Sequence, residues 1–219
     1  MIDLHTHSFL SDGELIPAEL IQRAERLGYR ALAITDHVDN SNLDFIAPRL
    51  VAAVPELNRH HQVQTIAGVE LTHLPPAMIA PAAARARELG VQLVVVHGQS
   101  PVEPVAEGTN RAAIEAGVDI LAHPGLITPD EVALAADKGV ALEISARGGH
   151  SLGNGRVASL AREAGATVVI NTDAHAPRDL VSRDFARTVG LAAGLSDQEV
   201  DAAFAASAAL ASRVLGVQL

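Results

Sequence analysis

Several histidines of this chain follow short apolar stretches, in positions where their side chains can meet. The chain has 10 histidines and no cysteine, so imidazole and oxygen groups must carry its chemistry. The first apolar stretch, residues 2–4, leads directly into His5-Thr6-His7. Alternate residues of an extended segment point to the same side, so the two imidazoles can bind one metal ion. Taken alone, the pair is equally consistent with two polar surface residues.

The later apolar stretches also end in histidine or carboxylate residues. Singly, each of these is more often an ordinary polar side chain, and Asp12 in Ser11-Asp12-Gly13 is explained as well by a turn. Their recurrence at six strand ends indicates a common site. If the ends converge, the candidate ligands are His5, His7, Asp12, His37, Glu70, His97, His123, Asp173 and His175.

These candidate ligands predict a site for two or three divalent metal ions. Three carboxylates gathered in one place would repel one another unless cations lay between them. Six imidazoles and three carboxylates without sulfur suit zinc, manganese or iron(II) better than calcium or copper(I). The sequence does not distinguish among these three metals.

Seven short β-branched stretches are predicted to be the strands that position these residues. They are residues 2–4, 31–34, 65–69, 93–96, 119–122, 141–144 and 167–170. The stretches are continuously apolar, which is typical of parallel strands covered on both faces by helices. Helix start signals such as Thr128-Pro129-Asp130-Glu131 lie between them. We therefore predict an α/β fold, a (β/α)7 TIM-like barrel with its active site at the carboxyl ends of the strands.

An open doubly wound sheet is the alternative that strand patterns alone leave open. No Pro/Gly/Ser-rich linker or block of charge divides the chain, so residues 1–219 are expected to form one domain. Ser207, Ser212 and Arg213 interrupt the alanine-rich segment 201–215, which is expected to be an amphipathic closing helix.

Composition restricts the partners of the chain. Its net charge of −10 and its aromatic content of 2% argue against nucleic-acid binding through a basic surface or stacked bases. No uncharged apolar stretch reaches the ~20 residues of a membrane span, and no basic-plus-apolar leader precedes residue 2. A cytoplasmic location is the expectation, and the oligomeric state is left open.

The motifs resemble those of the PHP family, the polymerase and histidinol phosphatase superfamily of metal-dependent phosphoesterases. The likeness covers nearly the whole chain, and no ligand is missing. The motifs are His5-Thr6-His7, Ser11-Asp12-Gly13, Thr35-Asp36-His37, Gly68-Val69-Glu70, the single His97, His123-Pro124 and Asp173-Ala174-His175. The resemblance implies a distorted seven-stranded barrel, a trinuclear metal centre and a free-standing hydrolase of phosphoric esters.

The same resemblance implies how three ions share the ligands. The implied division is His5, His7, Glu70 and Asp173 for one ion, Glu70, His97 and His123 for a second, and Asp12, His37 and His175 for the third. The spacing of the residues does not by itself establish this division.

The expected reaction is hydrolysis of a small-molecule phosphomonoester by a hydroxide that bridges the metal ions, as in histidinol phosphatases. Paired divalent ions lower the pKa of shared water toward ~7 and neutralise the leaving oxygen. Glu70 and Asp173 are the expected catalytic carboxylates, and the Arg147 guanidinium can bind two phosphate oxygens. A loop salt bridge is the alternative role of Arg147. Further candidates for the pocket wall are His73, His150 and Arg178.

Three other functions compete with this prediction. An amidohydrolase needs eight strands and often a bridging lysine, whereas Lys138, the only lysine here, precedes a strand. A catalytically silent metal-binding module of the same family should have lost ligands first. A phosphodiesterase or exonuclease acting on short nucleic acids needs an open groove, and the short connections between strands favour a closed pocket for monoesters.

Overall fold

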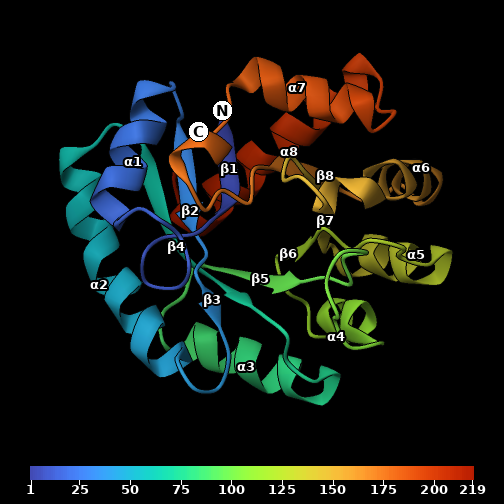
Figure 1. The fold of residues 1–219 in the computed structure, drawn as a ribbon, viewed down its shortest axis with the longest axis horizontal. Helices are drawn as coiled ribbons and strands as arrows, with labels where there is room; N and C mark the ends of the chain where they lie inside the picture. The colour runs from blue at the N-terminus through green and yellow to red at the C-terminus, as the bar shows by residue number, and fades with distance from the viewer.

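Seven parallel strands form a sheet that curls almost into a closed barrel, with helices around its outside (Figure 1). This computed structural model describes residues 1–219. In order around the sheet, the strands are β1 (Ile2–Thr6), β2 (Ala31–Ile34), β4 (Gln64–Leu71), β5 (Leu93–His97), β6 (Ile120–Ala122), β7 (Ala141–Ser145) and β8 (Val168–Asn171). The predicted (β/α)7 barrel is confirmed.

One further strand was not predicted. The strand β3 (His37–Val38) is two residues long and pairs with the end of β4, outside the path of the other strands. It places His37 directly beside Glu70 in register. A strand of two residues has too short a hydrophobic pattern to be recognised from the sequence.

The first and last strands close the barrel through the residues that follow them. A single bridge joins Thr6 to Ala174. The backbone N–H of His7 donates to the carbonyl of Ala174 over 2.9 Å, and that of Asp173 donates to the carbonyl of His5 over 3.0 Å. Closure of the barrel therefore fixes the same short segments that carry candidate ligands.

Helices alternate with the strands and cover their outer face (Figure 1). They are α1 (Pro17–Arg26), α2 (Leu43–His60), α3 (Pro76–Glu88), α4 (Thr109–Glu115), α5 (Pro129–Lys138), α6 (Asn154–Ala164), α7 (Arg183–Ala192) and α8 (Asp197–Leu215), with 3-10 turns η1 (His150–Gly153) and η2 (Pro177–Asp179). The predicted capping box at the start of α5 is present: the Thr128 hydroxyl accepts from the Glu131 N–H, and the Glu131 carboxylate accepts from the Thr128 N–H. No helix of the structure combines the length and apolar character needed to cross a membrane.

The barrel has one apolar cluster outside its strands and another inside. The outer cluster of 47 buried residues packs the helices against the sheet. The inner cluster of 12 buried residues contains inward-facing residues of the strands together with Ala211 of α8. Arg213, also on α8, reaches Asp119 at the start of β6. The closing helix expected near the C-terminus is therefore present, and it covers the amino-terminal end of the barrel.

Candidate metal centre

The inward faces of the strands carry apolar residues at depth and ligand-type residues at the carboxyl end. In β4, Ile66 belongs to the inner cluster, and Glu70 lies four residues further along on the same face. In β5, Leu93 and Val95 lead in the same way to His97. The alternation that builds the inner core thus also delivers ligand-type side chains to the rim of the barrel.

The two histidines at the end of β1 face Glu70 and Asp173 across this mouth. His5 Nε2 lies 3.3 Å from Glu70 Oε1 and 3.7 Å from Asp173 Oδ1. His7 Nε2 lies 3.2 Å from Asp173 Oδ1 and 3.6 Å from Glu70 Oε2. All four residues are buried. Two imidazoles and two carboxylates therefore converge, and His5, His7 and Glu70 lie close enough together to hold one metal ion.

His123 approaches Glu70 at the same carboxylate oxygen as His5. Its Nε2 is 3.7 Å from Glu70 Oε1 and 3.8 Å from Asp173 Oδ2. The ring of His97 meets the ring of His123 edge-on, with the centroids 4.5 Å apart. The Glu70 carboxylate is thus surrounded by histidines, with His5 and His123 near Oε1 and His7 and His37 near Oε2.

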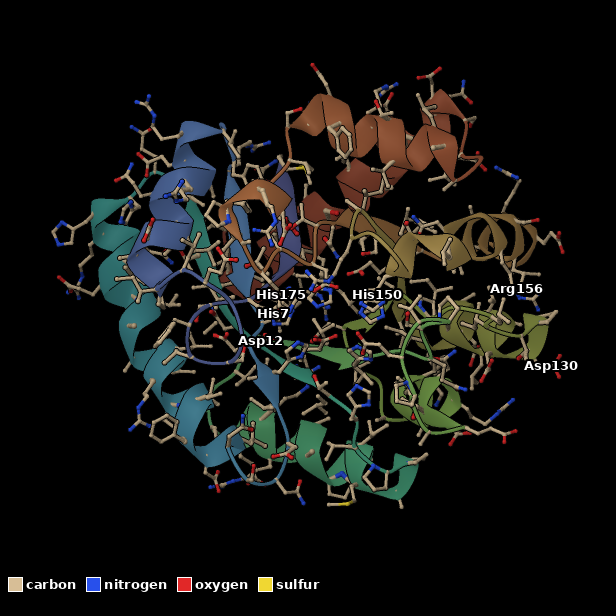
Figure 2. The ribbon with its side chains drawn as sticks, viewed as in Figure 1. His7, Asp12, Asp130, His150, Arg156 and His175 are labelled. Carbon is tan, nitrogen blue, oxygen red and sulfur yellow. The ribbon has the colours of Figure 1, made fainter.

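Asp12, His37 and His175 form a third group that is less buried. Asp12 Oδ1 lies 3.3 Å from His175 Nε2 and 3.6 Å from His37 Nε2. Figure 2 shows His7, Asp12 and His175 gathered near the centre of the mouth, with His150 to one side. The structure thus brings all nine candidate ligands predicted from the sequence to one end of the barrel.

Asp36 holds the loop that carries Asp12, a role that the sequence motif does not reveal. The buried Asp36 carboxylate accepts hydrogen bonds from the Ser8 N–H at 2.8 Å and the Ser8 hydroxyl at 2.7 Å. It also accepts from the Ser11 hydroxyl at 2.7 Å. Asp36 itself is occupied by these bonds, so it supports the third group of ligands without belonging to it.

Most buried side-chain polar atoms that lack a hydrogen-bond partner belong to this centre. They include His5 Nε2, both ring nitrogens of His7 and of His123, and both carboxylate oxygens of Glu70. His37 Nδ1 comes within 2.8 Å of Glu70 Oε2, but its hydrogen bond is with the Thr72 hydroxyl at 2.7 Å. Buried polar atoms without partners are costly and rare. Divalent cations would satisfy the carboxylate oxygens and one nitrogen of each imidazole, while the second nitrogen of His7 and of His123 carries a hydrogen.

Burial favours the neutral form of two of the histidines, whereas at His5 the nearby carboxylates of Glu143, Glu70 and Asp173 outweigh burial and raise the pKa well above its usual value. Burial lowers the pKa of His7 and of His123 well below the usual value, so both imidazoles are neutral at pH 7. Neutral imidazole is the form that binds a metal ion. Burial is also the main cause that raises the pKa of Asp173 to about 7, and a cation beside this carboxyl would favour its ionised form.

The backbone is strained at this end of the barrel. The non-glycine residues with positive φ are His73 at 54°, His123 at 27° and Asp173 at 52°. Such conformations cost about 1–3 kcal/mol each and persist where the surroundings impose them, often at functional sites. Two of the three residues, His123 and Asp173, are candidate ligands.

Arg147 lies at the rim in contact with this centre. Its Nη1 donates to the Asp173 carbonyl at 3.0 Å and to His175 Nδ1 at 2.9 Å, and its side chain is 33% exposed. The Nη2 group makes no hydrogen bond within the protein, so it can bind an oxygen of a ligand. Arg178 is 77% exposed and pairs with Glu14 rather than with any candidate ligand.

Two carboxylates near the centre were missed by the sequence analysis. Glu103 Oε2 lies 3.0 Å from His97 Nε2 and 3.3 Å from His73 Nε2. Glu143 Oε2 lies 2.8 Å from His5 Nδ1. Glu143 had a signal, because it is an acidic residue within an apolar strand. Glu103 lies in a loop after β5, where nothing in the sequence sets it apart.

A cavity of about 500 Å³ opens above these residues. Its wall includes Asp12, His73, His97, Glu103, Arg147 and His150. His150 is buried, and its ring stacks on His123 with the centroids 4.0 Å apart. The pocket-wall positions expected for His73 and His150 agree with this arrangement. The volume suits a small molecule.

Comparisons with known proteins agree with the motifs. The profile of the PHP domain family matches residues 3–115. The uncharacterized protein MJ1295 of Methanocaldococcus jannaschii is 49% identical over 201 residues, covering 91% of this chain and 92% of that protein. The DNA polymerase/3'-5' exonuclease PolX of Bacillus subtilis is 28% identical over 192 residues, covering 79% of this chain and 34% of that protein.

A solved structure shares the fold. Histidinol phosphate phosphatase of Lactococcus lactis, determined with zinc, L-histidinol and phosphate, superposes with a TM-score of 0.61. The identity is 16%, and the match covers 89% of this chain and 94% of that one. At this level of identity, the similarity indicates a shared fold and nothing more.

Proposed function

Because the chain belongs to the PHP domain family, we propose that it is a metal-dependent phosphoesterase that hydrolyses a small phosphomonoester. The observation that carries the proposal is the set of partnerless buried ligand atoms at the barrel mouth, on His5, His7, Glu70 and His123. A core without metal ions has no reason to keep these atoms unpaired. Residues 1–219 act as one domain in this proposal.

Three groups of side chains are proposed to hold two or three ions of zinc, manganese or iron. The groups are His5, His7, Glu70 and Asp173; Glu70, His97 and His123; and Asp12, His37 and His175. When bound, the ions supply a water molecule of lowered pKa and neutralise charge on the phosphate oxygens. The distances from its two oxygens to separate pairs of histidines, His5 and His123 at Oε1 and His7 and His37 at Oε2, support the role of Glu70 as the shared ligand.

The chain's own residues have separate tasks. Arg147, anchored through Nη1, presents its free Nη2 to the phosphate and orients it. The buried carboxylates of Glu70 and Asp173 would hold the ions at the reacting end of the cavity. The strained backbone at Asp173 supports this placement.

A small phosphorylated substrate fits the cavity better than a polynucleotide. The pocket of about 500 Å³ matches one small molecule, and the net charge of −10 disfavours a polyanion. Histidinol phosphate is a reasonable first compound, since the Lactococcus lactis phosphatase was solved with L-histidinol and phosphate. The cytoplasmic location expected from the sequence stays a prediction.

Phosphodiester hydrolysis is the second candidate function. It is favoured by the relative PolX, whose name includes a 3'-5' exonuclease and whose similarity covers 79% of this chain. The same ligand groups suit either ester, so the shape of the pocket must decide between them. A silent metal-binding module is disfavoured because all nine candidate ligands are present.

The test is a panel of substrates with the purified, metal-loaded protein. Histidinol phosphate, other small phosphomonoesters and short oligonucleotides are compared at equal concentration, with a chelator-treated sample as control. The proposal expects release of inorganic phosphate from at least one monoester and much slower cleavage of the oligonucleotides. Activity on oligonucleotides alone would favour the second candidate, and a metal-loaded protein inert on all of them would favour the silent module.

A further inference from the structure

A fully buried glutamate, Glu143, forms a hydrogen bond with the candidate ligand His5. Glu143 lies in β7, and none of its surface is exposed. Its Oε2 accepts hydrogen bonds from His5 Nδ1 at 2.8 Å and from Asn171 Nδ2 at 2.9 Å. Its Oε1 has no hydrogen-bond partner. No arginine or lysine pairs with this carboxylate, so its burial calls for an explanation.

Asn171 fixes the position of the Glu143 carboxylate. The Asn171 side-chain oxygen accepts from the backbone N–H of Leu4 at 3.0 Å. This bond settles the orientation of the amide, because only the NH2 group is then left to face Glu143. Since Leu4 and Asn171 lie in β1 and β8, the carboxylate is held relative to both strands that close the barrel.

The contact with Glu143 determines which nitrogen of His5 is free. A carboxylate only accepts hydrogen bonds, so His5 Nδ1 must carry the hydrogen. The lone pair of Nε2 then points to the volume beside Glu70 Oε1, at 3.3 Å, and Asp173 Oδ1, at 3.7 Å. The second nitrogen of a metal-bound histidine commonly donates to such a carboxylate, which orients the ring and strengthens the ligand.

We propose that Glu143 is a positioning residue that holds His5 in the tautomer and orientation needed to bind a divalent ion through Nε2. This inference rests on the proposed function, since it assumes an ion between His5, Glu70 and Asp173. Glu143 does not touch the ion or the substrate. It acts through His5, and the hydrogen bond from Asn171 holds its carboxylate in place.

A purely structural role would resemble that of Asp119, at the other end of the barrel. Asp119 is also buried, but it accepts from Arg87 Nη2, Arg213 Nη2 and the Val94 N–H, each at 2.8 or 2.9 Å. Its charge is balanced by two guanidinium groups. Glu143 has one oxygen unpaired and a histidine as its only ionisable donor. Asp119 is therefore a matched control for loss of a buried carboxylate.

The test compares zinc affinity in the Glu143→Gln and Asp119→Asn variants of the full chain. Each is titrated with Zn²⁺ against a chromophoric chelator, and circular dichroism of the metal-free protein verifies the fold. Glu143→Gln is expected to weaken the tightest zinc site by about 10- to 100-fold. Asp119→Asn is expected to change it by less than about threefold. Equal zinc affinity of Glu143→Gln and the parent protein overturns the inference.

A double-mutant cycle separates action through His5 from a general disturbance. In a His5→Ala background, Glu143→Gln should no longer alter zinc affinity, because the partner through which it acts is gone. An equal loss in both backgrounds contradicts the proposal. If Glu143→Gln does not fold, Asn171→Ser keeps the carboxylate and removes one of its donors, and zinc affinity should then fall several-fold; an unchanged affinity overturns the inference. If the parent protein itself binds no zinc, manganese or iron, the proposed function fails instead.

Discussion

The two ends of the barrel differ in whether their buried carboxylates have hydrogen-bond partners. At the amino-terminal end, both oxygens of the Asp119 carboxylate accept hydrogen bonds, from Arg87, Arg213 and the Val94 N–H. At the carboxyl end, Glu70 is completely buried, and neither of its oxygens has a hydrogen-bond partner. At one end the buried carboxylate is fully hydrogen-bonded, and at the other buried groups lie close to histidines without hydrogen bonds, where bound ions would satisfy them.

The carboxyl end of the barrel is costly in folding free energy. A buried polar group left without a partner costs about 1–3 kcal/mol, and more if it is charged. The positive φ angles of His123 and Asp173 add strain at the same end. The rest of the fold must offset these costs, and bound ions would recover part of them. Substitutions at one end of the barrel should therefore affect activity and stability differently from substitutions at the other.

Removal of metal ions is expected to have the largest effect. A chelator should abolish phosphate release, and adding back manganese or zinc should restore it. It should also lower the melting temperature, because ligand at 100 times its Kd stabilises a protein by about 2.7 kcal/mol, or roughly 5–10 °C for a chain of this size. Calorimetry with and without chelator measures the shift. An unaffected rate after verified metal removal would contradict a metal-dependent mechanism.

Glu70→Gln is expected to have the next largest effect. Histidines surround both oxygens of this carboxylate, so its loss should disturb two ions and lower kcat about 10³-fold or more, the equivalent of several kcal/mol. Steady-state kinetics and elemental analysis of the variant provide the measurement. His97→Ala is the comparison, and it should cost less because it touches one ion. The reverse order would argue against Glu70 as the shared ligand.

Arg147→Ala is expected to raise KM about 10-fold with little change in kcat. The guanidinium group would bind the phosphate equally in the ground state and the transition state, and such an interaction affects KM alone. Arg147→Lys should be intermediate, since an ammonium group keeps the charge but cannot be anchored through one nitrogen while it offers another to the phosphate. An unchanged KM in Arg147→Ala would assign the side chain to its contacts with Asp173 and His175 only.

Asp119→Asn tests the opposite end and should leave catalysis unchanged. The substitution removes a charge that pairs with Arg87 and Arg213, and we expect it to destabilise the protein by about 1–3 kcal/mol. Urea denaturation of the metal-free protein measures this loss. The kcat of the folded variant should stay within about twofold of the parent. A large fall in kcat would mean that the two ends are not independent.

The sequence predicts the barrel and its mouth because both depend on local patterns. Runs such as residues 93–96 specify a buried strand, and His97, two positions after the inward-facing Val95, lies on the same face at the rim. The same logic locates Glu70 and Asp173. These positions need no knowledge of the tertiary structure beyond the repeat of strand and helix.

The remaining features depend on contacts between distant segments. The strand β3 is too short to have a pattern, and the support of Ser8 and Ser11 by Asp36 joins two separate loops. The roles of Glu103 and Glu143 can be recognised only from the histidines that they contact in the folded chain. Likewise, the positive φ of His123 is imposed by tertiary packing and has no signature in its residue type.

Anomalous diffraction from crystals grown with manganese or zinc tests the central claim most directly. The account predicts two or three anomalous peaks at the carboxyl end of the barrel, one of them in contact with His5, His7, Glu70 and Asp173. Glu70→Gln crystals should lose at least one of these peaks. A parent crystal in which the mouth holds no peak, at a metal concentration that saturates the activity, would contradict the account.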